Sequence, residues 1–133
     1  MKKIILILLV INISCKNINR LKKDETKIKK FLISKKKEKF NLILDTISSF
    51  EWDELLVAGP YMDLNKISGY YLNEIPNTIK SHDSFILYCF IKNKRGIKYI
   101  ELERHLFSDK VFEKKILNRI YKKNESNFLI TKK

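Results

Sequence analysis

The feature of this sequence that most constrains the fold is Phe85–Ile91, a run of seven residues that are all hydrophobic. In a half-buried strand, hydrophobic and polar residues alternate, whereas this run would present hydrophobic side chains on both faces. We therefore expect it to be the central strand of a sheet, with a helix covering one of its sides.

A turn follows this run. Asn93–Gly96 precedes Ile97–Arg104, in which Ile100 and Leu102 alternate with more polar neighbours. Turn residues between two strand-like segments are typical of a β-hairpin. The sequence therefore predicts an antiparallel pair of strands here.

Three further segments have strand patterns. Phe40–Leu44 alternates between hydrophobic and polar residues, and Phe50–Val57 carries a second strand toward Pro60. Proline has no N–H to donate to a sheet, so that strand should end there. Asn127–Thr131 is expected to form a last short strand.

Two short helices are also expected. Asp63 can cap the first, whose hydrophobic residues are Leu64, Ile67 and Tyr71. Ser108 and Asp109 can start the second, whose hydrophobic residues are Phe112, Ile116 and Ile120. With 133 residues the chain is long enough for one domain. We predict an α+β fold over residues 38–133: a small antiparallel sheet of about four to five strands with one or two short helices.

The formal net charge of +13 lies mostly near one end of the chain. Residues 16–39 contain eleven Lys or Arg against three acidic residues, whereas residues 40–133 contain fifteen against twelve. We predict a basic tether over residues 15–37, with a turn or two of helix around Ile28, Phe31, Leu32 and Ile33. Its lysines either lie beside anionic lipid headgroups or are simply solvated. No basic stripe is interleaved with aromatic residues, so nucleic acid is not an expected partner.

The first residues are typical of an export signal. Met1–Lys3 is positively charged, and Ile4–Ile11 is an apolar run. A membrane-spanning helix needs about 20 mostly apolar residues, whereas this run is soon interrupted by Asn12 and Ser14. We therefore expect residues 1–14 to be a signal peptide.

The end of this segment, Ile11–Cys15, resembles the lipobox of bacterial lipoproteins, in which a small residue precedes a cysteine that is lipidated and becomes the new N-terminus. Ser14 and Cys15 match that pattern, and Asn12 stands where the family usually carries Leu. The resemblance implies a membrane anchor through lipid on Cys15, at the outer membrane or the cell surface. Plain secretion and an uncleaved anchor are the alternatives.

No hydrolase, phosphate-binding or paired-cysteine metal motif is present in the sequence. Glu101, Glu103 and His105 would share one face of a strand, but residues two apart lie about 6.5 Å from each other, too far for one metal ion. Cys89 lies in the hydrophobic run, where a thiol behaves as a small apolar side chain. We therefore expect no catalytic residue, no metal and no other cofactor, and predict that the protein is not an enzyme.

Trp52 and Asp53 precede a strand pattern that ends at Pro60 and Tyr61. This arrangement resembles a recurring group of small exported bacterial proteins of unknown function, often lipoproteins, with a Trp-Asp pair, a strand and a Pro-Tyr pair. The resemblance implies no activity or substrate. We expect Trp52 to be a core anchor, Asp53 a hydrogen-bond acceptor in a turn and Tyr61 a cover over the end of the strand.

The alternative is a surface pocket for a partner, built from Trp52 and Tyr61 with Tyr70 or Tyr71. The candidate partner-binding residues are therefore Trp52, Asp53 and Tyr61. Two functions remain. The first is a non-catalytic, lipid-anchored envelope protein that binds a protein or an envelope component. The second is an inhibitor or immunity-type module that neutralises an enzyme or toxin at the envelope.

Overall fold

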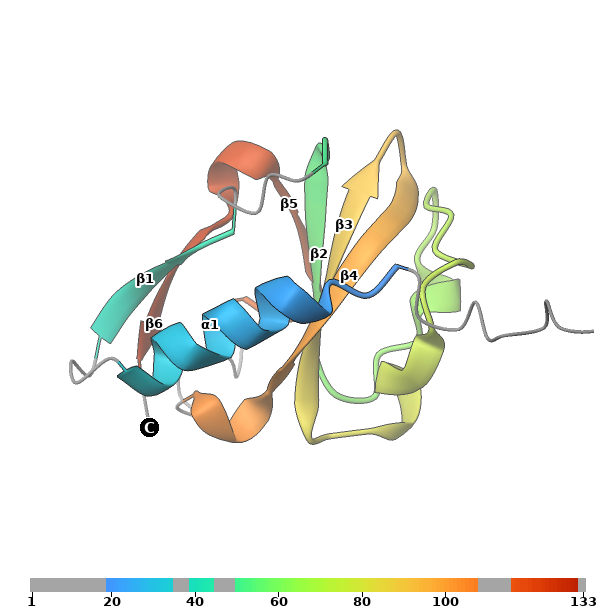
Figure 1. The fold of residues 1–133 in the computed structure, drawn as a ribbon. Helices are drawn as coiled ribbons and strands as arrows, with labels where there is room; N and C mark the ends of the chain where they lie inside the picture. Colours follow the sequence, from blue (N-terminus) through green and yellow to red (C-terminus); the bar gives the residue numbers. More distant parts are fainter. Residues whose placement is uncertain (1–18, 35–38, 45–49, 108–115, 132–133) are drawn as a thin grey trace, which may run out of the picture.

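The computed structural model describes residues 19–34, 39–44, 50–107 and 116–131. Its centre is a four-stranded antiparallel sheet with the order β4-β3-β2-β5, and a separate antiparallel pair, β1-β6, lies beside it (Figure 1). This arrangement confirms an α+β fold built on a small antiparallel sheet. The strands are β1 (Lys39–Ile43), β2 (Glu54–Ala58), β3 (Phe85–Lys92), β4 (Arg95–Glu103), β5 (Arg119–Lys122) and β6 (Asn127–Thr131).

Strand β3 lies between β2 and β4, as predicted for the hydrophobic run. Its side chains alternate between two buried clusters. Ile86, Tyr88 and Phe90 point into one cluster, whereas Leu87 and Cys89 point into the other. The two faces of β3 therefore belong to two separate cores.

The turn between β3 and β4 confirms the predicted hairpin. Asn93 and Lys94 have φ angles of 50° and 64°, and the flanking residues Lys92 and Arg95 are paired. Two consecutive residues with positive φ are typical of the tight hairpin turn whose twist matches that of the strands.

One face of the sheet packs against α1 (Lys22–Ser34) and against Leu44, which follows β1 (Figure 1). We call the buried residues on this face the helix-side core. They are Leu32, Leu44, Trp52, Leu55, Val57, Ile86, Tyr88, Phe90, Ile100, Leu102 and Phe107.

The other face packs against the long connection between β2 and β3, which contains the short 3-10 helices η2 (Leu64–Lys66) and η3 (Asn77–Ser81). We call the buried residues on this face the loop-side core. They are Leu56, Ala58, Leu64, Leu72, Ile75, Ile79, Leu87, Cys89, Ile91 and Tyr99.

Asp63 caps η2 as predicted, because its Oδ1 accepts a hydrogen bond from the backbone N–H of Asn65 at 3.1 Å. The helix itself is shorter than predicted. It ends after one turn, and Gly69 has a φ of 80°, which is incompatible with a right-handed helix. Tyr71 instead forms a β-bridge with Arg95.

The N-terminal part of the described chain differs from the predicted tether. Asn19–Leu21 pairs with β4 at Tyr99, and α1 follows as a helix of 13 residues. Leu21 and Ile28 pack against the helix-side core, and Leu32 is part of it. Residues 19–34 therefore belong to the folded domain, because burial of these apolar side chains fixes the helix on the sheet.

The C-terminal part differs from prediction at one element. The predicted helix with Ile120 on its hydrophobic face is wrong at that end, since Arg119–Lys122 forms β5 and Ile120 pairs with Leu56 of β2. Ser108, Asp109 and Phe112 lie outside the described residues. The last predicted strand, Asn127–Thr131, is confirmed as β6.

A substitution at Gly96 tests how closely the loop-side core is packed. A Cβ at this position would lie 2.8 Å from Ile75 Cγ1, 3.0 Å from Leu72 Cδ2 and 3.1 Å from Cys89 Sγ. Because these neighbours are packed under the sheet, we predict that Gly96→Ala lowers the free energy of unfolding by about 1–3 kcal/mol. Urea denaturation measures this, with Lys66→Ala on the exposed η2 as control, expected within about 0.5 kcal/mol of the unchanged protein. Equal stability of the two variants would contradict the close packing.

Candidate functional site

Trp52 is a buried residue of the helix-side core, only 3% exposed. Its ring meets that of Phe90 edge-on, with centroids 5.1 Å apart and an interplanar angle of 71°. Lys123 Nζ lies 5.0 Å from the centroid of the indole. Trp52 thus packs in the core and offers almost no surface to a partner.

Asp53 holds three strands together next to Trp52. Its N–H donates to the carbonyl of Ile91 at 2.8 Å, and its own carbonyl accepts from the N–H of Lys123 at 2.9 Å. The carboxylate Oδ2 accepts from the N–H of Asn93 in the hairpin turn at 2.9 Å. The side chain of Asp53 therefore stabilises the turn.

Tyr61 lies beyond the other end of β2 and is 65% exposed. It has a φ of 64°, and its N–H donates to the carbonyl of Ile79 at 2.9 Å. All five residues of β2 separate it from Trp52 and Asp53, so the structure does not bring the three candidate residues into one pocket. Tyr70 packs against the loop-side core, on the opposite face of the sheet from Trp52.

The structure contains instead an open pocket of about 470 Å³ that the sequence did not indicate. It lies where Asn19–Leu21 joins the outer edge of β4. Its lining residues are Arg20, Pro76, Thr78, His82, Phe85, Tyr99 and Glu101.

A charged network connects Arg20, Glu25 and Glu101 at this pocket. Arg20 Nε donates to both carboxylate oxygens of Glu25, at 2.9 and 3.0 Å. Arg20 Nη2 lies 3.2 Å from Glu101 Oε2, and the N–H of Glu101 donates to Glu25 Oε1 at 3.1 Å. Thr78 Oγ1 donates to the second oxygen of Glu101 at 3.3 Å. The polar groups of this wall thus bond mainly to one another.

The network neutralises a carboxylate, that of Glu25, which is buried in the protein. Burial lowers the pKa of Arg20, but the hydrogen bond to Glu25 and the charges of Glu101 and Glu25 outweigh it, so the pKa lies above its ordinary value. Glu25 is 4% exposed, although it lies in the first turn of a lysine-rich helix. A buried carboxylate requires a cation and hydrogen-bond donors, and Arg20 and the β4 backbone supply them.

Sequence reasoning missed this network for a physical reason. Glu25 and Glu101 are 76 residues apart, and no spacing rule relates them. The one local signal is the acidic pair Asp24 and Glu25 in a basic segment, which is the position where a helix N-terminus favours negative charge.

The histidines have structural contacts. His82 Nδ1 is 2.8 Å from the carbonyl of Thr78. His105 lies in the 3-10 helix η4 (Arg104–Leu106) rather than on β4, and its Nε2 is 3.4 Å from Glu103 Oε2. A hydrogen bond from Lys29 at 3.0 Å lowers the pKa of Glu103, against a smaller opposing effect of burial.

Cys89 and the groups able to ligate a metal ion are the remaining candidates for chemistry. Among the described residues, no group of three or more His, Cys, Asp or Glu side chains is placed to hold a metal ion. Cys89 is fully buried, and this burial raises the pKa of its thiol to about 12. A thiol with such a pKa is protonated at neutral pH and therefore a weak nucleophile.

Comparison with known proteins gives no relative for this chain: no family model, curated protein or solved structure matches it. Within the residues that the structure describes, no helix is long and apolar enough to cross a membrane. Cys15, the predicted site of lipidation, lies outside those residues.

Replacement of Glu25 tests the network. In Glu25→Ala, the N–H of Glu101 loses its acceptor and Arg20 loses its bidentate partner. We predict a loss of about 2–4 kcal/mol in the free energy of unfolding. Asp24→Ala is the matched control, because it removes one carboxylate from the same turn, and we expect a loss of about 0.3–1 kcal/mol. Similar losses for the two variants, measured by chemical denaturation, would argue against a structural role for the network.

Proposed function

We propose that the protein is an exported lipoprotein, anchored to the cell envelope through lipid on Cys15, whose domain binds a protein or envelope partner without catalysis. The observation that carries this proposal is the order of features at the N-terminus. A basic start, the apolar run Ile4–Ile11 and the pair Ser14-Cys15 precede Asn19, whose carbonyl is already bonded to β4.

The short distance between Cys15 and the first described residue, Asn19, supports an anchor at Cys15. The carbonyl of Asn19 accepts a hydrogen bond from the N–H of Tyr99 at 2.9 Å. Asn19 lies four positions after Cys15, so the two Cα atoms lie at most about 14 Å apart. Cleavage before Cys15 would leave every described element of the domain intact.

A binding role without catalysis agrees with the chemistry of the described residues. The pocket at β4 has a wall of polar groups that bond to one another, and the thiol of Cys89 is buried. Of the three candidate partner-binding residues, Trp52 is buried and Asp53 bonds to the hairpin turn, whereas Tyr61 presents most of its surface to solvent. We therefore propose Tyr61 as the partner contact.

The test is the mass and membrane partitioning of the chain expressed in a bacterium. We expect the native chain to begin at Cys15, to carry added acyl mass and to sediment with membranes. Cys15→Ala should lose the acyl mass and the cleavage together, because the modified sulfur is absent. Cys89→Ala is the matched control, since it removes the other cysteine. This variant should keep both the acyl mass and the cleavage before Cys15.

Retention of Met1 in a cytosolic protein would contradict the proposal. So would an unmodified secreted chain cut at another residue. If a lipidated chain is found, the partner is sought in the envelope fraction by crosslinking.

A further inference from the structure

The outward side of α1 carries a row of lysines. Lys23, Lys27 and Lys30 follow i, i+4, i+7 spacing, which places them on one side of a helix. All three are exposed, whereas Glu25 and Leu32 on the opposite side of the helix are buried. We call these three residues the lysine row.

The lysine row differs from two other cations of this region. Arg20 pairs with Glu25 and Glu101, and Lys29 pairs with Glu103 at 3.0 Å. By contrast, the lysine row has no ion pair with any described residue. Carboxylates of the described residues therefore neutralise Arg20 and Lys29 but not the lysine row.

This arrangement is unfavourable for the isolated domain. Lysines at i, i+4 and i, i+3 repel each other by a few tenths of a kcal/mol per pair. Lys23 also lies in the first turn, where the helix dipole disfavours a positive charge. An anionic surface next to the row would reverse both effects.

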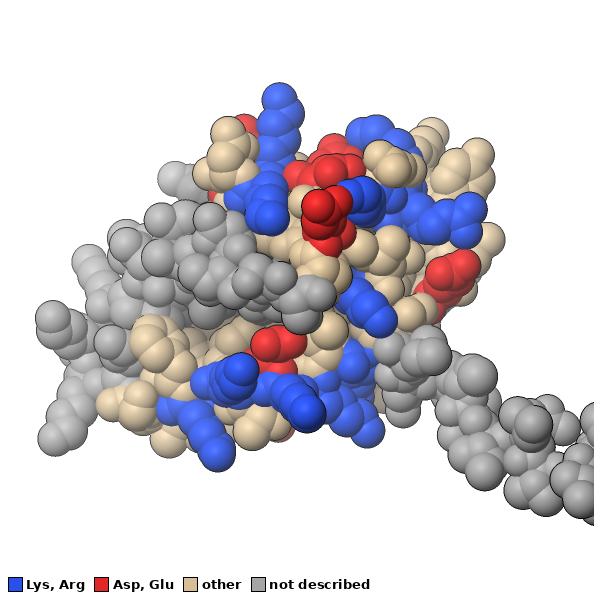
Figure 2. All heavy atoms as spheres, turned by 45° about the horizontal axis from the view of Figure 1, so that its top comes forward, with Lys and Arg blue, Asp and Glu red and all other residues tan. Residues whose placement is uncertain are grey.

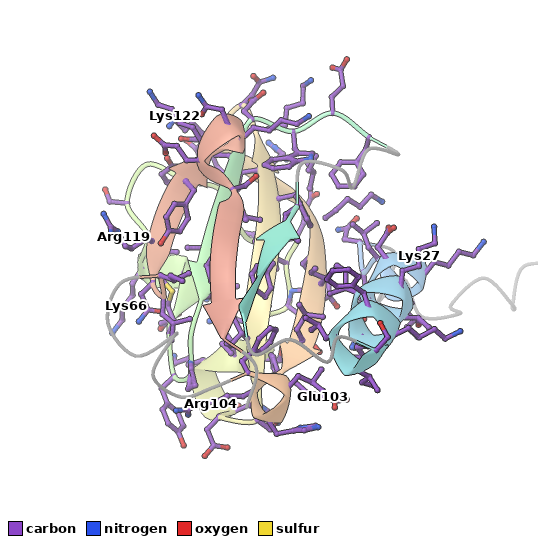
Figure 3. All side chains as sticks on the ribbon, turned by 90° about the vertical axis from the view of Figure 1, so that its left-hand side faces the viewer. Lys27, Lys66, Glu103, Arg104, Arg119 and Lys122 are labelled. Carbon is purple, nitrogen blue, oxygen red and sulfur yellow. The ribbon has the colours of Figure 1, made fainter. Side chains whose placement is uncertain are left out.

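The figures place the row on a separate face. Lys27 points away from the sheet, whereas Lys66 and Lys122 lie on the opposite side of the molecule (Figure 3). Blue side chains also follow the lower border of the space-filling view, where α1 lies (Figure 2). A planar surface could therefore contact α1 without touching Lys66 or Lys122.

The place of the row relative to the anchor identifies the surface. If Cys15 carries lipid, as proposed above, its sulfur lies at the bilayer, and Asn19 lies within about 14 Å of it. Helix α1 begins at Lys22 and is about 20 Å long. Because this connection is short, the lysine row reaches the headgroups when α1 lies along the membrane surface.

We infer that the lysine row of α1, Lys23, Lys27 and Lys30, rests on anionic phospholipid headgroups and thereby orients the domain on the membrane. The row spans about 10 Å along the helix axis, and no aromatic side chain lies between its members, which favours a lipid surface over a nucleic acid. Each lysine near an anionic leaflet contributes about 1 kcal/mol, or about fivefold in occupancy of the contact.

The test compares the reactivity of individual lysines on two kinds of vesicle. The purified chain, in its processed form, is added to vesicles of phosphatidylcholine alone or of phosphatidylcholine with phosphatidylglycerol. A water-soluble acetylating reagent is applied briefly, and mass spectrometry gives the rate at each lysine. Lys66 and Lys122 are internal controls in the same molecule.

We expect phosphatidylglycerol to slow acetylation of the lysine row at least about fivefold. The rates at Lys66 and Lys122 should be unchanged. The protection should vanish at about 1 M salt, where the Debye length is about 3 Å. Equal rates on the two vesicles, or equal protection of Lys66 and Lys122, would overturn the inference.

Two double variants test whether the protection depends on the lysine row or only on the net positive charge of the protein. In the double variant Lys23→Gln/Lys30→Gln, the acetylation rate of Lys27 still reports the contact. We expect Lys27 to lose most of its protection from acetylation in this variant. Lys66→Gln/Lys122→Gln removes the same charge elsewhere and should leave Lys27 protected; loss of protection in this control would overturn the inference. The mass of the N-terminal peptide reports separately whether Cys15 carries lipid, so a failed anchor and a failed lysine row give different results.

Discussion

The ion pair of Arg20 with Glu25, shared with Glu101, is the interaction on which the rest of the structure depends. It lies at the outer edge of β4, where an exposed strand would otherwise present unpaired backbone groups. Asn19 and Leu21 pair with Tyr99, and the carboxylate of Glu25 accepts the next outward N–H, that of Glu101. The network therefore closes the sheet edge and at the same time fixes the start of α1.

This attachment determines how the domain relates to its N-terminus. A free basic tether would let the domain sample many orientations, whereas a helix fixed to β4 presents one defined face outward. The division between the cations that pair with described carboxylates and those of the lysine row follows from the same geometry. Arg20 and Lys29 turn toward carboxylates of the fold, and Lys23, Lys27 and Lys30 turn away from it. The proposed anchor and the proposed membrane contact thus depend on one local structure.

The sequence predicted the elements whose signal is local and strong. The continuous hydrophobic run was correctly predicted as a central strand, β3, and the turn at Asn93 and Lys94 as a hairpin. Both patterns are complete within a few residues, so no distant contact is needed to recognise them. Only a turn or two of helix α1 was predicted, because just Ile28 and Leu32 pack in the helix-side core among many lysines. One of the two fully buried residues of α1 is the charged Glu25. The pocket and its network were missed because they join residues that only tertiary pairing brings together. Strand β5 has four residues, too few for a period to be recognised.

The most direct test of this account is native-state hydrogen exchange of the whole chain, followed residue by residue. If the network fixes residues 19–34 to the sheet, these residues should become exposed to exchange only when the whole domain unfolds. The amides of Leu21, Tyr99 and Glu101 and those of the middle of α1 should then exchange as slowly as the amides of β3. If α1 exchanges rapidly while β3 remains protected, residues 19–34 are a tether, and the orientation of the domain on a membrane has no structural basis.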